Sequence, residues 1–217
     1  MSSRVSQQTL FFRQFLDDFV NMGAILPSSP ALGRAAVAYL ARKQGQVDVL
    51  EAGPGTGPFT REIVPLLTAG DTFDMVELNT NLIAYLKKRL AEEAAFQVAP
   101  GVKAHLINAD LRSLGPGKAY DYIIFSLPLT NFPPPLVDEV LTLMVDRLKP
   151  GGVFSYVKYA FISQVKYWLG GRAAHKPMDA NQAIIRRFAE QYQIERRLVW
   201  PNVPPTWVHY WQKPVTD

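Results

Sequence analysis

A short apolar run leads directly into a glycine-rich turn, in the order Val49-Leu50-Glu51-Ala52-Gly53-Pro54-Gly55-Thr56-Gly57. Residues 47–51 are typical of a buried strand, and residues 59–67 have the apolar spacing of a helix. Glycines at such a junction let the backbone turn sharply and approach a ligand closely. The third glycine follows the second by two residues, whereas the fingerprint for a dinucleotide pyrophosphate needs three. Glu51 would also repel a pyrophosphate, so the turn favours a different ligand.

Strands and helices are predicted to alternate along most of the chain. Further strands are expected at 73–77, 102–108, 120–126 and 152–158, and further helices at 31–42, 79–93 and 136–148. A helix at 180–191 and paired strands at 193–200 and 206–212 follow. This alternation predicts a doubly wound α/β fold, a parallel sheet with helices on both faces, that ends in an antiparallel strand pair. We expect a single domain over residues 1–217, with a helical extension (residues 1–30) ahead of the core (residues 31–217).

The carboxylate at position 51 suggests the kind of ligand. A carboxylate beside the turn suits a cationic group, which it would hold by a charge-assisted hydrogen bond. The α-amino group of S-adenosylmethionine (SAM) is such a cation. Residues 49–57 resemble motif I of SAM-dependent methyltransferases, and this resemblance implies a class I, Rossmann-like domain that uses SAM and releases S-adenosylhomocysteine (SAH). The alternative interpretation is a glycine turn with a surface glutamate.

Acidic residues also end the next two predicted strands. Glu77 lies 20 residues beyond Gly57, where a carboxylate can accept hydrogen bonds from both ribose hydroxyls. The resemblance assigns the adenine amino group to Asp110. Either acid could instead be a solvated residue at a strand end, but three acids at successive strand ends fit a ligand site. The expected cofactor-binding residues are Ser29, Glu51, Gly53, Pro54, Gly55, Thr56, Gly57, Glu77, Leu78, Asn79, Ala109, Asp110, Leu111 and Ser126.

The residues after the fourth predicted strand, Ser126-Leu127-Pro128-Leu129, bear on the methyl acceptor. At this place amino-methyltransferases carry an Asx-Pro-Pro-aromatic or Asn-Leu-Pro-Tyr element. Here Ser126 takes the first position, and no aromatic residue follows Pro128 directly. This departure argues against an adenine N6-methyltransferase, in which the aromatic ring stacks on a flipped base.

Nearly the whole chain resembles the small bacterial phospholipid N-methyltransferases that act on phosphatidylethanolamine. The likeness rests on residues 9–22, 23–30, 126–129 and 202–208. It implies three successive methyl transfers from SAM to the ethanolamine amine, which give phosphatidylcholine. Three other interpretations stay open: methylation of another aminolipid such as an ornithine lipid, RNA adenine dimethylation, and a non-catalytic SAM-sensing or lipid-binding module.

Methyl transfer to nitrogen depends mainly on positioning the two partners and excluding water. We expect the carbonyl groups of Pro128 and Leu129, or the Asn131 side chain, to orient the amine, whose proton passes to water. Tyr159, or another aromatic such as Tyr156, would stabilise the quaternary product by a cation–π contact. A phosphodiester acceptor needs cations but no metal. The candidate substrate-binding residues are Lys158, Lys166, Trp168, Arg172 and Arg187.

Charge is distributed unevenly along the chain, whose net charge is +4. Residues 147–213 carry 11 basic side chains against three acids, which suggests a polyanionic partner. An apolar helix at 9–22 and the aromatic, basic stretch 158–176 favour an anionic membrane surface, with no nucleic acid. The alternatives are a solvated basic face, a core-packing helix and an ordinary helix with snorkelling lysines.

Neither a transmembrane helix nor a secretory signal is predicted. No run of about 18 uncharged apolar residues occurs, and Arg13, Asp17 and Asp18 interrupt the apolar segment that follows Leu10. The chain has no cysteine, so no disulfide can form. We therefore expect a cytoplasmic monomer that associates peripherally with the inner face of the cytoplasmic membrane.

Overall fold

The computed structural model describes residues 28–114, 117–129, 132–159 and 171–215, with the backbone alone at residues 159 and 171–178. The predicted helix at 9–22 and most of the aromatic, basic stretch 158–176 lie outside these residues. So do three expected site residues, Asn131, Lys166 and Trp168, and the side chains of Tyr159 and Arg172. The interpretations placed on them stay predictions.

The described residues form a seven-stranded sheet whose centre is parallel. Its strands are β1 (Asp48–Ala52), β2 (Thr72–Glu77), β3 (Lys103–Asn108), β4 (Tyr120–Phe125), β5 (Leu148–Tyr159), β6 (Gln193–Val199) and β7 (Thr206–Gln212). They lie in the order β3-β2-β1-β4-β5-β7-β6. Strand β7 is antiparallel to both β5 and β6. The predicted α/β class and the antiparallel terminal pair are confirmed.

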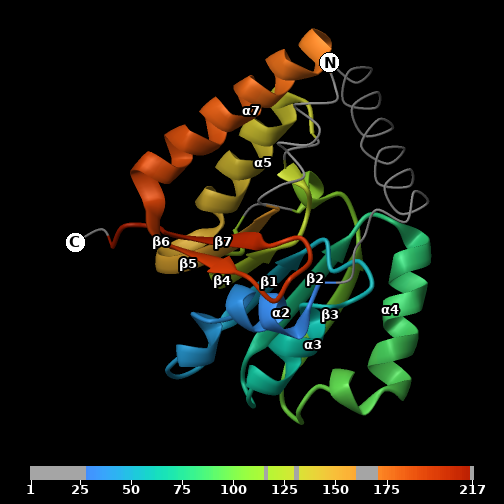
Figure 1. The fold of residues 1–217 in the computed structure, drawn as a ribbon. Helices are drawn as coiled ribbons and strands as arrows, with labels where there is room; N and C mark the ends of the chain where they lie inside the picture. Colours follow the sequence, from blue (N-terminus) through green and yellow to red (C-terminus); the bar gives the residue numbers. More distant parts are fainter. Residues whose placement is uncertain (1–27, 115–116, 130–131, 160–170, 216–217) are drawn as a thin grey trace.

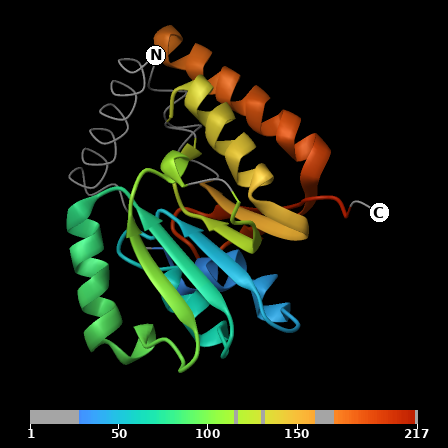
Figure 2. The ribbon, with the colours of Figure 1, turned by 180° about the vertical axis from the view of Figure 1, so that it is seen from behind.

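Helices cover both faces of the sheet (Figures 1 and 2). On one face lie α2 (Pro30–Ala36), η1 (Leu40–Arg42), α3 (Thr60–Ile63), η2 (Val64–Leu66), α4 (Thr80–Glu92) and η3 (Ala94–Phe96). On the other face lie η4 (Leu111–Ser113) and the neighbouring helices α5 (Pro134–Asp146) and α7 (Gly171–Tyr192). Successive side chains of a strand point to opposite faces of the sheet. Val49 therefore packs under α2, and Leu50 packs under α5.

Three helix boundaries differ from the prediction. The predicted helix at 31–42 is divided into α2 and η1, and the helix at 59–67 is divided into α3 and η2. In the second case Pro65 lacks the N–H that would continue the α-helical ladder. Helix α7 begins at Gly171 rather than at residue 180, so it continues through Pro177. Its apolar side chains, including Ile185 and Phe188, pack against the α5 cluster, and this tertiary burial stabilises a helix that local propensity alone would end.

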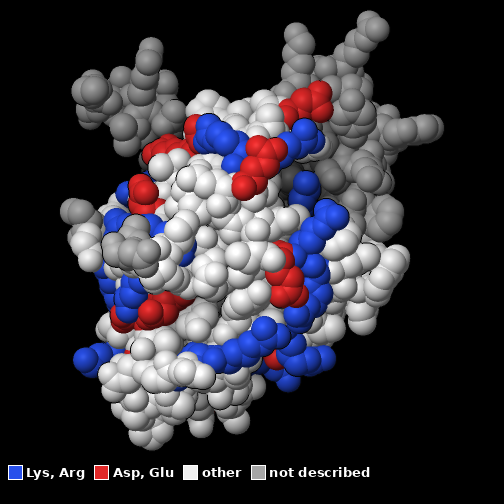
Figure 3. Space-filling view, turned by 90° about the vertical axis from the view of Figure 1, so that its left-hand side faces the viewer, with Lys and Arg blue, Asp and Glu red and all other residues white. Residues whose placement is uncertain are grey.

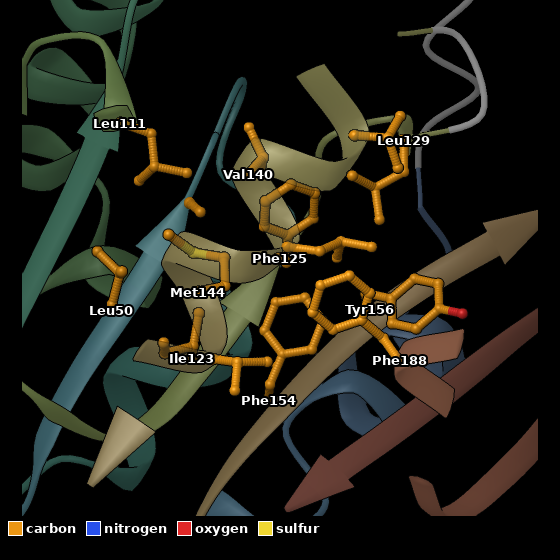
Figure 4. Packing of buried hydrophobic residues seen from close by; sticks show 14 of the residues in the cluster. Leu50, Leu111, Ile123, Phe125, Leu129, Val140, Met144, Phe154, Tyr156 and Phe188 are labelled. Atoms are coloured by element: carbon orange, nitrogen blue, oxygen red, sulfur yellow. The ribbon is translucent and has the colours of Figure 1, made fainter. Parts of the chain in front are cut away.

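Aromatic side chains hold α5 and α7 to the sheet. Phe154 is fully buried, and its ring centroid lies 5.6 Å from that of Phe125 and 5.8 Å from that of Tyr156. Figure 4 shows these rings packed beside Met144 of α5 and Phe188 of α7. Burying one such side chain contributes about 1.5–3 kcal/mol. The parallel strands therefore end at a rigid edge, where Ala52, Glu77, Asn108 and Phe125 are the last strand residues.

Candidate functional site

All three glycines of the turn that follows β1 have positive φ, including Gly57 at +84°. Gly53 has φ +74°, and a Cβ there would lie 2.2 Å from Leu127 Cδ2. Gly55 has φ +59°, but a Cβ there would meet nothing within 4 Å. Gly53 is thus needed for close packing inside the fold, whereas the space above Gly55 is open to a ligand.

Ser126, at the end of β4, holds this turn in place. Its Oγ donates to the carbonyl oxygens of Gly53 (2.6 Å) and Ala52 (3.1 Å). The Gly53 N–H donates to the carbonyl of Val76 (2.9 Å), so the turn is bonded to strands on both sides. The structure places Ser126 against the backbone of the turn, and its role at the cofactor stays a prediction.

Glu51 is fully buried under the turn, so the alternative of a surface glutamate is wrong. Its Oε2 accepts a hydrogen bond from Thr60 Oγ1 (2.7 Å), while its Oε1 has no hydrogen-bond partner among the described residues. Burial raises the pKa of the Glu51 carboxyl to about 8, and the charge of Glu77 adds to the rise. A buried acceptor without a donor fits an ammonium group, which would both complete the hydrogen bonding and favour the ionised carboxylate.

Glu77 connects the end of β2 to the same turn. One carboxylate oxygen accepts from the Gly55 N–H (3.1 Å), and the other accepts from the Asn79 N–H (2.9 Å). At 4% exposed it is not a solvated strand-end acid. Asn79 caps α4 through bonds from the N–H groups of Asn81 and Leu82, so the residues assigned to the ribose are anchored by α4.

Asp110 lies at the end of β3 and is engaged by Arg112. The Arg112 guanidinium donates to both carboxylate oxygens, with Nη2 2.6 Å from Oδ2 and Nε 3.0 Å from Oδ1. Asp110 also caps η4 through the Arg112 N–H (2.9 Å). The neighbouring Ala109 N–H donates to the Glu77 carbonyl, and Leu111 is buried in the α5 cluster. An adenine at this place would therefore meet a carboxylate that an arginine already orients.

On the acceptor side the structure describes only part of the predicted set. The Leu129 side chain is 3% exposed, and its carbonyl already accepts from the Phe132 N–H (3.2 Å). Pro128 is half-buried beside it. Ser29 caps α2, and its own N–H donates to Asn202 Oδ1 (2.9 Å) on the loop between β6 and β7. Ser29 therefore joins the start of the core to this loop.

The predicted substrate cations separate into two groups. Arg187 forms an ion pair with Asp138, which links α7 to α5. Lys158 is half-buried near the end of β5 and has no such pair among the described residues. The sequence did not indicate Arg112, Thr60 or Arg89, whose Nη1 donates to the Thr56 carbonyl (2.6 Å). Of these, only Thr60 carried a signal, a hydroxyl near the start of the helix that follows the turn.

Comparison with known proteins agrees with this geometry. Residues 49–152 match the model of a methyltransferase domain. Over 148 residues the chain is 28% identical to the ornithine lipid N-methyltransferase of Singulisphaera acidiphila. The matched region covers 68% of this chain and 76% of that protein.

Solved structures share the fold. A putative rRNA methylase from Clostridium thermocellum superposes with a TM-score of 0.60 at 17% identity, over 86% of this chain and 97% of that one. The N-methyltransferase NodS from Bradyrhizobium japonicum WM9, in complex with SAH, superposes with a TM-score of 0.58 at 14% identity, over 86% and 89%.

The fold and the turn under which Glu51 lies define a class I, Rossmann-like methyltransferase domain. The buried Glu51 carboxyl and the open space above Gly55 fit SAM as the methyl donor, as the resemblance of residues 49–57 implied. Taken together, the comparisons support a SAM-dependent methyltransferase.

Proposed function

We propose that this protein is an N-methyltransferase of a membrane aminolipid, with phosphatidylethanolamine and its mono- and dimethyl derivatives as acceptors and phosphatidylcholine as the final product. A second candidate acceptor is an ornithine lipid, which is favoured by the likeness to the ornithine lipid N-methyltransferase of Singulisphaera acidiphila. Both acceptors present a primary amine beside an anionic group. The observation that carries the proposal is the buried Glu51 Oε1, which finds no hydrogen-bond partner in the described part of the chain and lies under an open glycine turn. The likeness to an aminolipid N-methyltransferase adds to it.

The roles of this chain's residues follow from the contacts above. SAM, when bound, supplies a methyl group on a sulfonium. Glu51 accepts a hydrogen bond from its α-ammonium, and Gly55 leaves room for the ligand beside the backbone. Ser126 keeps the turn in that conformation. Pro128 and Leu129 carry no ionisable group themselves, and we expect the amine to pass its proton to water before it attacks.

A lipid acceptor requires access to a membrane surface, and the loop between β6 and β7 has suitable chemistry. Two large apolar side chains of this loop, Trp200 and Val203, are 68% and 79% exposed. Asn202, between them in sequence, is 2% exposed and donates to the Pro204 carbonyl and to Thr206 Oγ1, both at 2.9 Å. The loop is thus held in shape while its apolar side chains face solvent, and tryptophan favours the depth of lipid headgroups.

The loop also lies at the edge of the sheet where the site is. Strand β6 runs parallel to β5, because β7 is antiparallel to both. The end of β6 is therefore on the same edge as the ends of β1 and β4. No described helix is long and apolar enough to cross a bilayer. Contact through this loop would bring the site to the lipid surface.

The test is methyl transfer from labelled SAM to vesicles that contain either phosphatidylethanolamine or ornithine lipid in phosphatidylcholine. We expect organic-extractable label with one or both aminolipids and none with phosphatidylcholine alone. Chromatography of the products would count the methyl groups added. A protein that binds SAM but labels neither lipid would contradict the proposal, and labelling of a structured RNA would support the adenine dimethyltransferase interpretation instead.

A further inference from the structure

Several basic residues between positions 147 and 213 have partners within the fold. Carboxylates pair with Lys149, Arg187 and Arg197. Backbone carbonyls accept hydrogen bonds from Arg147 and Lys213. Figure 3 views the molecule from the left-hand side of Figure 1 and shows Lys and Arg side chains mixed with Asp and Glu side chains on that face. These five cations therefore already have partners within the fold.

Three cations of the same segment, Lys158, Arg186 and Arg196, form no ion pair or hydrogen bond with the described residues. Glu190 lies one turn beyond Arg186 on α7, but it pairs with none of them in the described part of the chain. Their charge is therefore not neutralised by the residues that the structure describes.

Strand pairing gathers these groups around one aromatic ring. Lys158 of β5 is the register partner of Trp207 in β7. The Arg196 guanidinium of β6 lies over that ring, with Cζ 4.9 Å from its centroid. Helix α7, which carries Arg186, packs against both β6 and β7. Burial lowers the pKa of Lys158, and the charge of Arg186 lowers it further. Two strands thus present Lys158 and Arg196 beside Trp207, and the helix that packs on these strands carries Arg186.

The group lies next to the acceptor side of the site. Phe125, the last residue of β4, is the register partner of Tyr156 in β5. Lys158 follows two residues later, on the same face of the sheet, beyond the point where β4 has ended. Ser126 and Pro128 continue the chain from that point. A molecule that reaches past Pro128 toward β5 would therefore meet Lys158.

Tyr156 adds a neutral donor to these cations. Its side chain is 2% exposed, and its hydroxyl has no hydrogen-bond partner among the described residues. The ring of His209 stacks on it at 4.8 Å between centroids. Burial lowers the pKa of His209 to about 4, and the charges of Lys158 and Arg196 contribute. Both cations therefore act on the imidazole that covers Tyr156, and this imidazole is itself neutral at pH 7.

We propose that Lys158, Arg186 and Arg196 bind the anionic group of the acceptor lipid, with the Tyr156 hydroxyl as an additional donor. The inference rests on the proposed function and adds to it a binding site for the part of the headgroup that does not react. In phosphatidylethanolamine this anion is the phosphodiester, and in an ornithine lipid it is the carboxylate. Each lies a few bonds from the amine, so anchoring it fixes the distance from the amine to the methyl donor.

The experiment measures initial rates of methyl transfer to two soluble acceptors, dihexanoyl phosphatidylethanolamine and a short-chain ornithine lipid. The variants are Lys158→Gln, Arg186→Gln, Arg196→Gln and the charge-preserving Lys158→Arg. Lys87→Gln is the matched control, because Lys87 is an exposed cation on α4. We expect Lys158→Gln to raise the KM for the lipid at least about tenfold, as loss of a charged hydrogen bond does. The Kd for SAM should change less than about twofold, and Lys158→Arg should recover most of the KM.

The outcomes separate the anion site from the proposed N-methyltransferase function. A raised KM with both acceptors assigns the site to anions in general, and a raised KM with one acceptor alone assigns it to a phosphodiester or to a carboxylate. If the wild-type protein methylates a lipid and the three Gln variants match Lys87→Gln in KM, the anion site is refuted while the proposed function stands. If the wild-type protein methylates neither acceptor, nor the long-chain lipids in vesicles, both are refuted.

Discussion

Binding of SAM should depend on pH through Glu51. Without a ligand the pKa of this carboxyl is raised to about 8, mainly by burial. The ammonium of SAM requires the ionised form, so below pH 8 binding must first remove a proton. One pKa unit corresponds to about 1.4 kcal/mol, which makes this cost about 2.7 kcal/mol at pH 6 and about 1.4 kcal/mol at pH 7. The Kd for SAM should therefore fall roughly tenfold between pH 6 and pH 7. The decrease should level off near pH 8, where Glu51 is half ionised and the α-amino group of SAM begins to lose its proton.

Isothermal titration calorimetry at pH 6.5, in two buffers of different ionisation enthalpy, measures the protons released. We expect close to one proton for each SAM bound. Glu51→Gln keeps the shape of the side chain but cannot ionise, so its binding should be weak and independent of pH. Thr60→Val removes the hydrogen bond that lowers the pKa of Glu51, so the pH-dependent range should extend to higher pH. A wild-type Kd that stays constant from pH 6 to pH 7, with no proton released, would refute the role given to Glu51.

Three further predictions concern stability and the lipid surface. Because the folded-state pKa of Glu51 lies above its unfolded value, its protonated form stabilises the fold; SAM-free protein should lose stability in urea as the pH rises from about 4.5 to 8, and Glu51→Gln should remove that part of the slope. Gly53→Ala places a Cβ at positive φ and 2.2 Å from Leu127, so it should lower the unfolding free energy by about 1–3 kcal/mol; an unchanged denaturation midpoint would show that the turn adjusts freely. Replacing both Trp200 and Val203 by Ser should reduce sedimentation with anionic vesicles several-fold and leave the rate on a soluble short-chain acceptor unchanged; equal sedimentation would exclude the loop as a membrane contact.

The sequence indicated the fold and the cofactor edge because both depend on local patterns. Alternating strands and helices predict the parallel sheet, and the spacing of Glu51, Glu77 and Asp110 places acids at three strand ends. Burial was harder to predict. Nothing in the spacing shows that Glu51 is 0% exposed or that one of its oxygens lacks a donor. Both depend on the tertiary packing around Glu51, where Thr60, the first residue of α3, donates to Oε2.

Cation roles could not be read from the sequence, since they depend on partners far along the chain. Arg187 looked available for a phosphate, yet Asp138, 49 residues away, pairs with it across the interface of α5 and α7. Arg196 looked like one of many surface charges, but its position over Trp207 depends on the register of β6 with β7. The distribution of charge along the sequence therefore indicated a basic region. The fold determined which of its Lys and Arg side chains have no ion-pair partner among the described residues.

The position of β7 has a consequence for how the protein is made. This strand is the last of the described strands in sequence order, but it lies inside the sheet, between β5 and β6. Until the ribosome has released it, β5 presents an unpaired edge and β6 has no strand to join. We therefore expect the nascent chain to depend on chaperones until β7 has emerged, and a stop codon before residue 206 to leave an aggregation-prone product rather than a shorter enzyme.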